Sequence, residues 1–286
     1  MLAETETPGA VPSAPIPMSF LTARAGLLRE LAAVAGTLVD EVKLTFGPDG
    51  LTFNAVDPQH VAMLSASLPP ACFRQRHFPE PRSVGLDVKL LRKVLTRWGE
   101  SEPVMDIAAP SAHGGSDSSG WVEGKGAVTL RLGPMRRSLW GVDIGALTEP
   151  RIPKLDLSTV VSMPTSLLRL MVDSIGDVSD HLVFEAEYGP AWGAALRVVD
   201  GGHDDRNGGV EFSIGPFDEV HVTMQKGTAK VRAAFPLDYF QTFVKVIRAP
   251  YVRLEFADEY PMRITFALSG GGGEAFFLIA PRIEND

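Results

Sequence analysis

The sequence has little cysteine, no long apolar run and no excess of positive charge, and each absence excludes a class of protein. Its 286 residues include a single cysteine, Cys72, so no disulfide can form within the chain, and a reducing compartment is indicated. No stretch approaches the roughly 18 consecutive apolar residues that a membrane-spanning helix needs. The formal net charge of -8 at pH 7 argues against a surface that binds nucleic acid over its whole extent. We therefore expect a cytoplasmic protein without membrane contact, on which any basic surface is local.

The composition is that of a globular protein, with 45% hydrophobic and 22% charged residues. The chain is long enough for two domains that each bury a core of their own. Residues 1–17 are rich in proline, alanine and acids, and they lack the basic start and apolar run of a secretory signal. We predict that they form a flexible tail.

Hydrophobic periodicity predicts four helices among many short strands. The first helix is expected at about 22–39 and the second at 87–99, whereas the third and fourth follow Pro164 and Pro236, a residue that suits the first helical turn. Two alternating runs within residues 42–57 flank a Pro-Asp-Gly turn, which indicates a hairpin. The mixture predicts an α+β fold.

The same order of elements occurs twice along the chain, which indicates an internal duplication. The hairpin with the aspartate that ends it, at 39–57, is matched by 178–200, and the second helix with its lead-in, at 85–95, is matched by 236–246. We predict an N-terminal domain at 18–145, a connector at 146–163 and a C-terminal domain at 164–286. Two insertions rich in glycine, serine and aspartate, at 109–126 and 200–209, are expected to be mobile hairpin tips.

Basic residues are concentrated on the predicted helices, although the chain is acidic. For one helix alone, a charged face that only meets solvent is the ordinary explanation. Basic residues occur on all four helices, however, and they outnumber the acids there, so the positive charge of the chain is collected on the helices. These residues are Arg24, Arg29, Lys89, Arg92, Lys93, Arg97, Arg169, Lys245 and Arg248.

Five segments in register resemble sliding clamps of the proliferating cell nuclear antigen (PCNA) type. They are "AVDPQHVAML" at 55–64, "GLDVKLLRKVL" at 85–95, "VSDH" at 178–181, "FPLDYFQTFVKVI" at 235–247 and "LIAPRIEND" at 278–286. The resemblance implies a duplicated two-domain DNA-clamp fold in a trimeric ring, with β-sheets outside and four helices lining the pore. It further implies that the ring encircles duplex DNA as a processivity factor associated with the nucleoid, or with the nucleus if the source is eukaryotic. The nine basic residues of the helices are then the DNA-binding residues, which contact phosphates without reading the sequence.

The resemblance also implies a pocket for short peptides of partner proteins, namely DNA polymerase, the clamp loader, flap endonuclease and ligase. Apolar residues that accept aromatic anchors suit such a site. By position, the pocket residues are Val56, His60, Met63, Ile152, Pro153, Pro261, Leu278, Ala280 and Pro281. Subunit contacts are expected at edge strands near 134–142 and 193–199, of which Arg136 and Arg137 make the first basic. No cofactor is implied.

Two other functions stay open at this point, a subunit of a heterotrimeric checkpoint-type clamp and a monomeric processivity factor that does not encircle DNA. An enzyme is not indicated, because His60 lacks a recognisable nucleophile beside it. The glycine run at 270–273 lies between two strand-like segments, which indicates a hairpin turn and not a phosphate-binding loop. His203, Asp204 and Asp205 match metal ligands in composition alone.

Overall fold

The computed structural model describes residues 19–78, 81–99, 101–108, 125–147, 149–189, 193–201, 209–215, 219–269 and 271–282. The predicted tail, nearly all of both glycine-rich insertions, and the cluster at 203–205 lie outside these ranges. No helix within them is long and apolar enough to cross a membrane.

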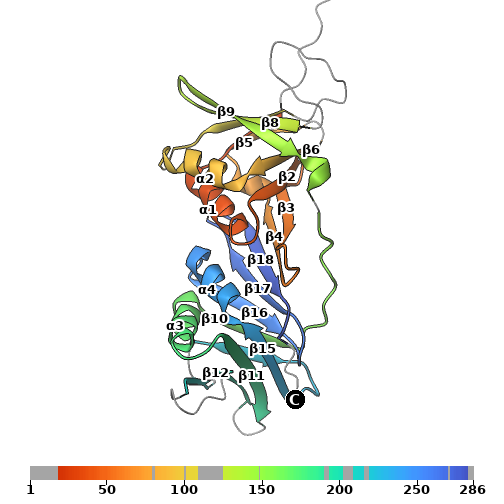
Figure 1. The fold of residues 1–286 in the computed structure, drawn as a ribbon, viewed down its shortest axis with the longest axis vertical. Coiled ribbons are helices and arrows are strands. Elements are labelled where there is room, and N and C mark those ends of the chain that lie inside the picture. Colours follow the sequence, from red (N-terminus) through yellow and green to blue (C-terminus); the bar gives the residue numbers. More distant parts are fainter. Residues whose placement is uncertain are drawn as a thin grey trace, which may run out of the picture.

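Four α-helices of the described residues lie along one long side of the molecule (Figure 1). They are α1 (Ala25–Ala35), α2 (Val88–Thr96), α3 (Thr165–Gly176) and α4 (Leu237–Val246). The predicted start of the first helix at Thr22 was wrong, because residues 19–22 form a strand and Arg24 has extended backbone angles. The remaining three helices are confirmed near the predicted positions.

The strands form a 14-stranded sheet and a four-stranded sheet. Short 3-10 helices occur at η1 (Pro70–Cys72) and η2 (Ile144–Ala146). The strands are β1 (Ser19–Thr22), β2 (Glu41–Gly47), β3 (Gly50–Val56), β4 (Ala62–Leu68), β5 (Gln75–His77), β6 (Arg82–Asp87), β7 (Val104–Ala108), β8 (Lys125–Leu132), β9 (Met135–Asp143), β10 (Thr159–Pro164), β11 (His181–Gly189), β12 (Gly193–Asp200), β13 (Glu211–Ile214), β14 (His221–Met224), β15 (Lys230–Pro236), β16 (Tyr251–Phe256), β17 (Met262–Ala267) and β18 (Glu274–Ile279).

The predicted hairpin is formed by β2 and β3. Its turn requires glycine, because Gly50 has a φ of 117° and a side-chain carbon there would lie 2.0 Å from the carbonyl oxygen of Leu68. Alternate residues of β2, such as Leu44 and Phe46, are buried, which leaves the other face of the sheet away from the core. Between sheet and helices, the rings of Phe243 on α4 and Phe277 on β18 stack with centroids 3.8 Å apart. The core therefore fills the space between one sheet face and the helices.

The two halves of the chain share one continuous sheet, because β4 of the first half pairs with β18 of the second, from Ala62↔Ile279 to Ser67↔Glu274. A buried carboxylate adds a second tie, since Oε2 of Glu30 on α1 accepts a hydrogen bond from the backbone nitrogen of Ser269 at 3.0 Å. The halves meet side by side along the sheet and the helices (Figure 1). Residues 159–163, which we expected in the connector, belong to β10.

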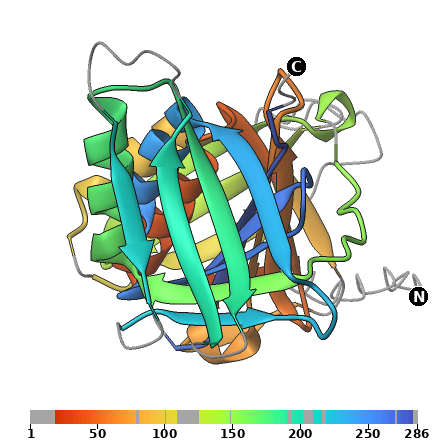
Figure 2. The same ribbon diagram turned by 90° about the horizontal axis from the view of Figure 1, so that it is seen from below.

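The four-stranded sheet has the order β13-β12-β11-β15, and Figure 2 shows it at one end of the molecule with α3 at its side. The strand predicted at 193–199 is not the outermost one, because β13 pairs with β12 from Leu196 to Val199. The sequence prediction failed because β13 has only 4 residues and follows the second insertion. On the opposite half, β9 pairs with β8 along its length but with β6 only at Gly85↔Val142.

Candidate nucleic-acid interface and peptide-binding site

The helix side of the molecule presents most of the predicted DNA-binding side chains to solvent. On α2, burial of Leu91, Val94 and Leu95 directs the intervening basic positions outward, as a helical repeat requires. On α4, Phe240, Phe243 and Val244 are buried in the same way. The exposed basic residues on or next to these helices and α1 are Arg24, Lys89, Arg92, Lys93, Arg97, Lys245 and Arg248.

Lys89 differs from the others because it has a close acidic partner. Its Nζ lies 2.7 Å from Oδ1 of Asp40, and the hydrogen bond with this carboxylate raises the pKa of Lys89. Both side chains are exposed, so the pair is weak and can exchange partners. Nearby, Oδ1 of Asp87 accepts a hydrogen bond from the backbone nitrogen of Leu90 at 2.7 Å and caps the start of α2. Lys89 therefore stays protonated, but the carboxylate of Asp40 offsets its charge while the pair is formed.

Arg29 and Arg169 bind backbone carbonyls at or just beyond the end of a neighbouring helix. Nη2 of Arg169 donates to the carbonyl oxygens of Val244 at 2.9 Å and Ile247 at 3.4 Å, at the end of α4. Nη1 of Arg29 donates to the carbonyl oxygen of Gly99 at 3.2 Å, just beyond α2. The last carbonyls of a helix lack partners within it, so Arg169 supplies a donor to the last turn of α4, whereas Arg29 binds the segment that follows α2. The sequence analysis missed this role. Its signal was a Leu-Leu-Arg triplet that occurs at 27–29 on α1 and again at 167–169 on α3.

Three predicted pocket residues lie in one row across adjacent strands, on the sheet face away from the helices. The register pairs Val56 of β3 with Met63 of β4, and Met63 with Leu278 of β18. Leu278 is only 4% exposed, but it does not pack in the hydrophobic core between the sheet and the helices. The row continues to Arg263 of β17, which sequence reasoning missed. Its guanidinium carbon lies 5.2 Å from the ring centroid of Phe276, a cation–π distance.

The turn from Asp57 to Val61 borders this row. The carboxylate of Asp57 accepts hydrogen bonds from the backbone nitrogens of Gln59 at 3.1 Å and Ala62 at 2.7 Å. His60 has a φ of 58°, a left-handed conformation that residues with a side chain rarely adopt. Val56 and His60, with Ala146 and Leu147, which we had not predicted, line part of a hollow of about 220 Å³.

The segment after β18 lies beside the same turn. The backbone nitrogen of Ala280 donates to the carbonyl oxygen of Val61 at 2.9 Å, and that of Arg282 to Ala234 at 2.7 Å. This places the predicted residues Ala280 and Pro281 beside the turn that carries His60. Pro261, at the start of β17, is half-buried.

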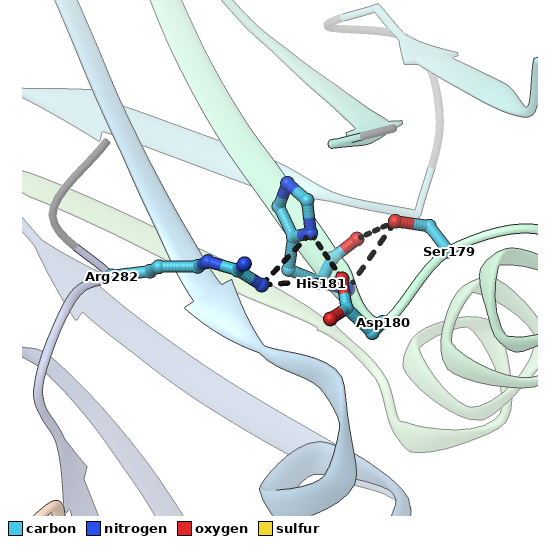
Figure 3. A network of polar contacts seen from close by, with 4 residues as sticks. All are labelled: Ser179, Asp180, His181 and Arg282. Carbon is cyan, nitrogen blue, oxygen red and sulfur yellow. Dashed lines mark hydrogen bonds and ion pairs between the residues drawn. The ribbon is translucent and has the colours of Figure 1, made fainter. Parts of the chain in front are cut away.

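A polar network anchors the same segment (Figure 3). Nη1 of Arg282 donates to Oδ1 of Asp180 at 3.2 Å, and Nδ1 of His181 lies 2.7 Å from the same oxygen. Hydrogen bonds with His181 and then Arg282 lower the pKa of Asp180. The hydroxyl of Ser179 donates to the carbonyl oxygen of His181 at 2.9 Å. The motif at 178–181 and the C-terminal motif, which no sequence pattern joins, are thus in contact.

The connector runs along the side opposite the helices (Figure 1). Nζ of Lys43 on β2 lies 2.7 Å from Oε2 of Glu149, and the backbone nitrogen of Gln225 donates to the carbonyl oxygen of Ser158 at 2.8 Å, so both ends are tied to the body. Between these ties, Ile152 and Pro153 are exposed. The predicted pocket residues therefore come from the connector, the sheet face and the segment after β18.

Within the described ranges, no group of three or more His, Cys, Asp or Glu side chains is arranged to hold a metal ion.

The glycine run at 270–273 lies between β17 and β18 in the sequence, and these two strands pair with each other. The hairpin predicted there is therefore confirmed.

The chain is similar to archaeal sliding clamps over nearly its whole length. The DNA polymerase sliding clamp of Methanothrix thermoacetophila is 30% identical over 262 residues, covering 91% of this chain and 96% of the relative. That of Methanocella arvoryzae is 27% identical over 265 residues, covering 92% and 97%. No protein-family model matches the chain.

Solved structures of PCNA have the same fold. A structure of the C-terminal region of FEN-1 bound to Archaeoglobus fulgidus PCNA superposes with a TM-score of 0.75 at 23% identity, covering 94% of this chain and 100% of the other. PCNA from Thermococcus kodakaraensis gives a TM-score of 0.73 at 21% identity, with 92% and 100% covered. These likenesses establish the duplicated α+β clamp fold.

Proposed function

Because this chain belongs to the DNA polymerase sliding clamp family, we propose that three copies of it close into a ring around duplex DNA and hold replication proteins on the template. Two clamp domains per chain, the first ending with η2 and the second beginning with β10, give six in the ring. The protein acts as a scaffold and carries no catalytic site of its own.

The observation that carries this proposal is the row of basic side chains along the helices. Among the described residues, eight exposed basic side chains lie on or next to the four helices, four of them on or next to α2, although the chain as a whole has a net charge of -8. A basic surface attracts phosphates and releases condensed counterions without reading bases. We propose that Arg24, Arg92, Lys93, Arg97, Lys245 and Arg248 face DNA, that Lys89 joins them when its pair with Asp40 opens, and that Arg29 and Arg169 chiefly hold the helices in place.

Ring closure needs two different surfaces on each copy, because a head-to-tail contact joins unlike patches. We propose that β9 of one copy pairs with β13 of the next, which satisfies both open edges. Arg136 and Arg137 make the β9 edge basic, and Glu211 and Glu219 line the groove at β13. That groove also contains Leu167, Leu170, Phe212 and Ile214, and 55% of the Leu170 surface is exposed. The paired surfaces are therefore complementary in charge and apolar in part.

Partner proteins dock on the opposite side in this proposal. The fragment seen in the A. fulgidus complex is the C-terminal region of FEN-1, and we propose that this chain takes peptides of the same kind from flap endonuclease, DNA polymerase, the clamp loader and ligase. The row formed by Val56, Met63 and Leu278 supplies the apolar floor, and His60 and Pro261 its borders. Ile152 and Pro153 cover it from the connector, and Ala280 and Pro281 border it beside the turn that carries His60.

The experiment that tests the ring combines mass with topology. The purified chain of 30.8 kDa is expected to form a complex of three times that mass, which is loaded onto closed circular DNA and released when the DNA is cut. A chain that stays monomeric alone but assembles with other subunits would indicate a heterotrimeric clamp. Equal retention on circular and linear DNA would indicate a factor that does not encircle it.

A further inference from the structure

We propose that Tyr239 is a positioning residue for peptide binding, whose hydroxyl, on a helix of the DNA side, holds the turn that borders the peptide pocket on the opposite side. This inference rests on the proposed peptide site. It assigns to the site a residue that does not line it and that belongs to the other half of the chain.

The contact spans 182 positions of sequence. The hydroxyl of Tyr239 on α4 donates to Oδ2 of Asp57 at 2.7 Å, and its oxygen lies 3.0 Å from Oε1 of Gln59. A hydroxyl carries one proton, and a carboxylate is the stronger acceptor. The bond to Asp57 is therefore the principal one, and Gln59 packs against the same oxygen.

Asp57 is the residue that organises the turn. It is 5% exposed. Its two carboxylate oxygens accept hydrogen bonds from the backbone nitrogens of Gln59 and Ala62 and from the hydroxyl of Tyr239. A carboxylate that is buried in this way depends on a full set of donors. Burial, and then the bond to Asp57, raise the pKa of Tyr239, so the hydroxyl keeps its proton and remains a donor throughout the physiological range.

The turn that Asp57 organises carries His60 in its left-handed conformation, with the backbone nitrogen of His60 bonded to the carbonyl oxygen of Asp57 at 3.0 Å. Such a conformation persists only when its surroundings fix it. Val56 and His60 line the hollow next to this turn. When the hydroxyl of Tyr239 is lost, Asp57 lacks one donor and the turn is held less firmly, so a bound peptide must also order the pocket border.

The hydroxyl can be removed without disturbing the packing of the aromatic ring. The ring of Tyr239 lies beside that of Phe243, with centroids 6.0 Å apart, and phenylalanine keeps this contact. Tyr239→Phe therefore removes one interaction across the two halves and leaves α4 packed. Tyr188→Phe is the matched control, because Tyr188 lies on β11 with 54% of its surface exposed.

The test measures binding of a synthetic peptide with the sequence of the A. fulgidus FEN-1 C-terminal region to the assembled clamp by fluorescence anisotropy. We expect Tyr239→Phe to raise the Kd about five- to tenfold, mainly through faster dissociation. This is less than the full loss of a hydrogen bond to a charged group would cause, because the hydroxyl acts on the peptide only through the turn. Tyr188→Phe is expected to leave the Kd unchanged, and all three proteins to have the same mass and the same retention on circular DNA.

Amide hydrogen exchange separates a positioning role from a general loss of stability. We expect faster exchange of the Gln59 and Ala62 amides in Tyr239→Phe, with unchanged exchange in the rest of β4. A Kd within twofold of the wild type would overturn the inference while leaving the peptide site intact, whereas a wild-type clamp that does not bind the peptide would overturn the site itself. If Tyr239→Phe does not assemble, Asp57→Asn tests the same hydrogen bond from the acceptor side. An unchanged Kd in Asp57→Asn would also contradict the inference.

Discussion

Single aspartates fix the backbone at three places around the two proposed surfaces. Asp87 caps α2, Asp57 closes the turn beside the proposed pocket, and Asp180 anchors the segment after β18 through Arg282. Each is short, so its carboxylate reaches nearby donors at little cost in side-chain entropy. The sequence shows these residues but not their partners, because Asp180 and Arg282 are 102 positions apart.

The anchor at Asp180 predicts a pH dependence confined to acid. The folded pKa of Asp180 is lowered by His181 and Arg282, so its contribution to stability is present above the unfolded value, about 3.9, and is lost as the pH falls through the lower folded pKa. Asp180→Asn is expected to remove this contribution at neutral pH, which hydrogen exchange of the Arg282 amide would report as a faster rate. Asp173→Asn, at an exposed position on α3, is the control, and an Arg282 rate equal in Asp180→Asn and wild type would contradict the anchor.

At the scale of elements, periodicity predicted the four helices and the first hairpin because one face of each is buried. It failed for β1, where Ser19–Thr22 is short and runs directly into α1. It also failed at β13, since four residues carry too little alternation to identify a strand. The sequence did not predict the contacts between elements, above all those of Arg29 with the segment after α2 and of Arg169 with the end of α4.

The arginine that binds the end of α4 predicts a loss of stability. Arg169→Ala leaves the carbonyl of Val244 without this donor, and we expect the free energy of unfolding to fall by about 1 to 2 kcal/mol, measured by urea denaturation. Arg248→Ala is the control, because this exposed residue follows α4, and surface substitutions usually change stability by less than about 0.5 kcal/mol. Equal effects of the two substitutions would mean that Arg169 does not support α4.

The groove between α3 and β13 predicts the state of assembly. Leu170→Glu places a charge in a surface that we expect to be buried between copies, so the complex should dissociate to single chains of 30.8 kDa. Ile152→Glu changes another exposed apolar residue, 39% exposed on the connector, and should leave the mass unchanged while weakening peptide binding. Light scattering distinguishes the two, and an intact trimer in Leu170→Glu would remove this groove from the interface.

At the scale of the whole molecule, the chain separates two surfaces by a layer of sheet and helices. The basic side and the proposed peptide side share a continuous sheet through β4 and β18. Composition alone indicated that any basic surface must be local. The basic residues on the duplicated helices indicated that this surface lies on the helix side. Residue patterns alone did not indicate the proposed ring, because the open stretch of β9, which pairs with β6 only at Gly85↔Val142, and the edge strand β13 are identified by strand pairing.

Salt dependence tests the charge of the helix side. Lys93→Gln with Lys245→Gln removes two exposed charges from each chain, and the slope of log affinity for DNA against log salt should become shallower, by about one for each phosphate that is no longer neutralised. Arg151→Gln with Lys154→Gln removes two charges from the connector and should leave the slope unchanged. A larger effect from the connector pair would contradict the assignment of the DNA-facing side.

The most direct test of the central claim is site-specific photo-crosslinking to DNA in the loaded clamp. A photoreactive amino acid at position 93, on α2, is expected to crosslink to the duplex, and the same group at position 154, on the connector, is not. Crosslinks from position 154 in the absence of any from position 93, on a clamp that is retained by circular DNA, would show that the helices do not face the DNA.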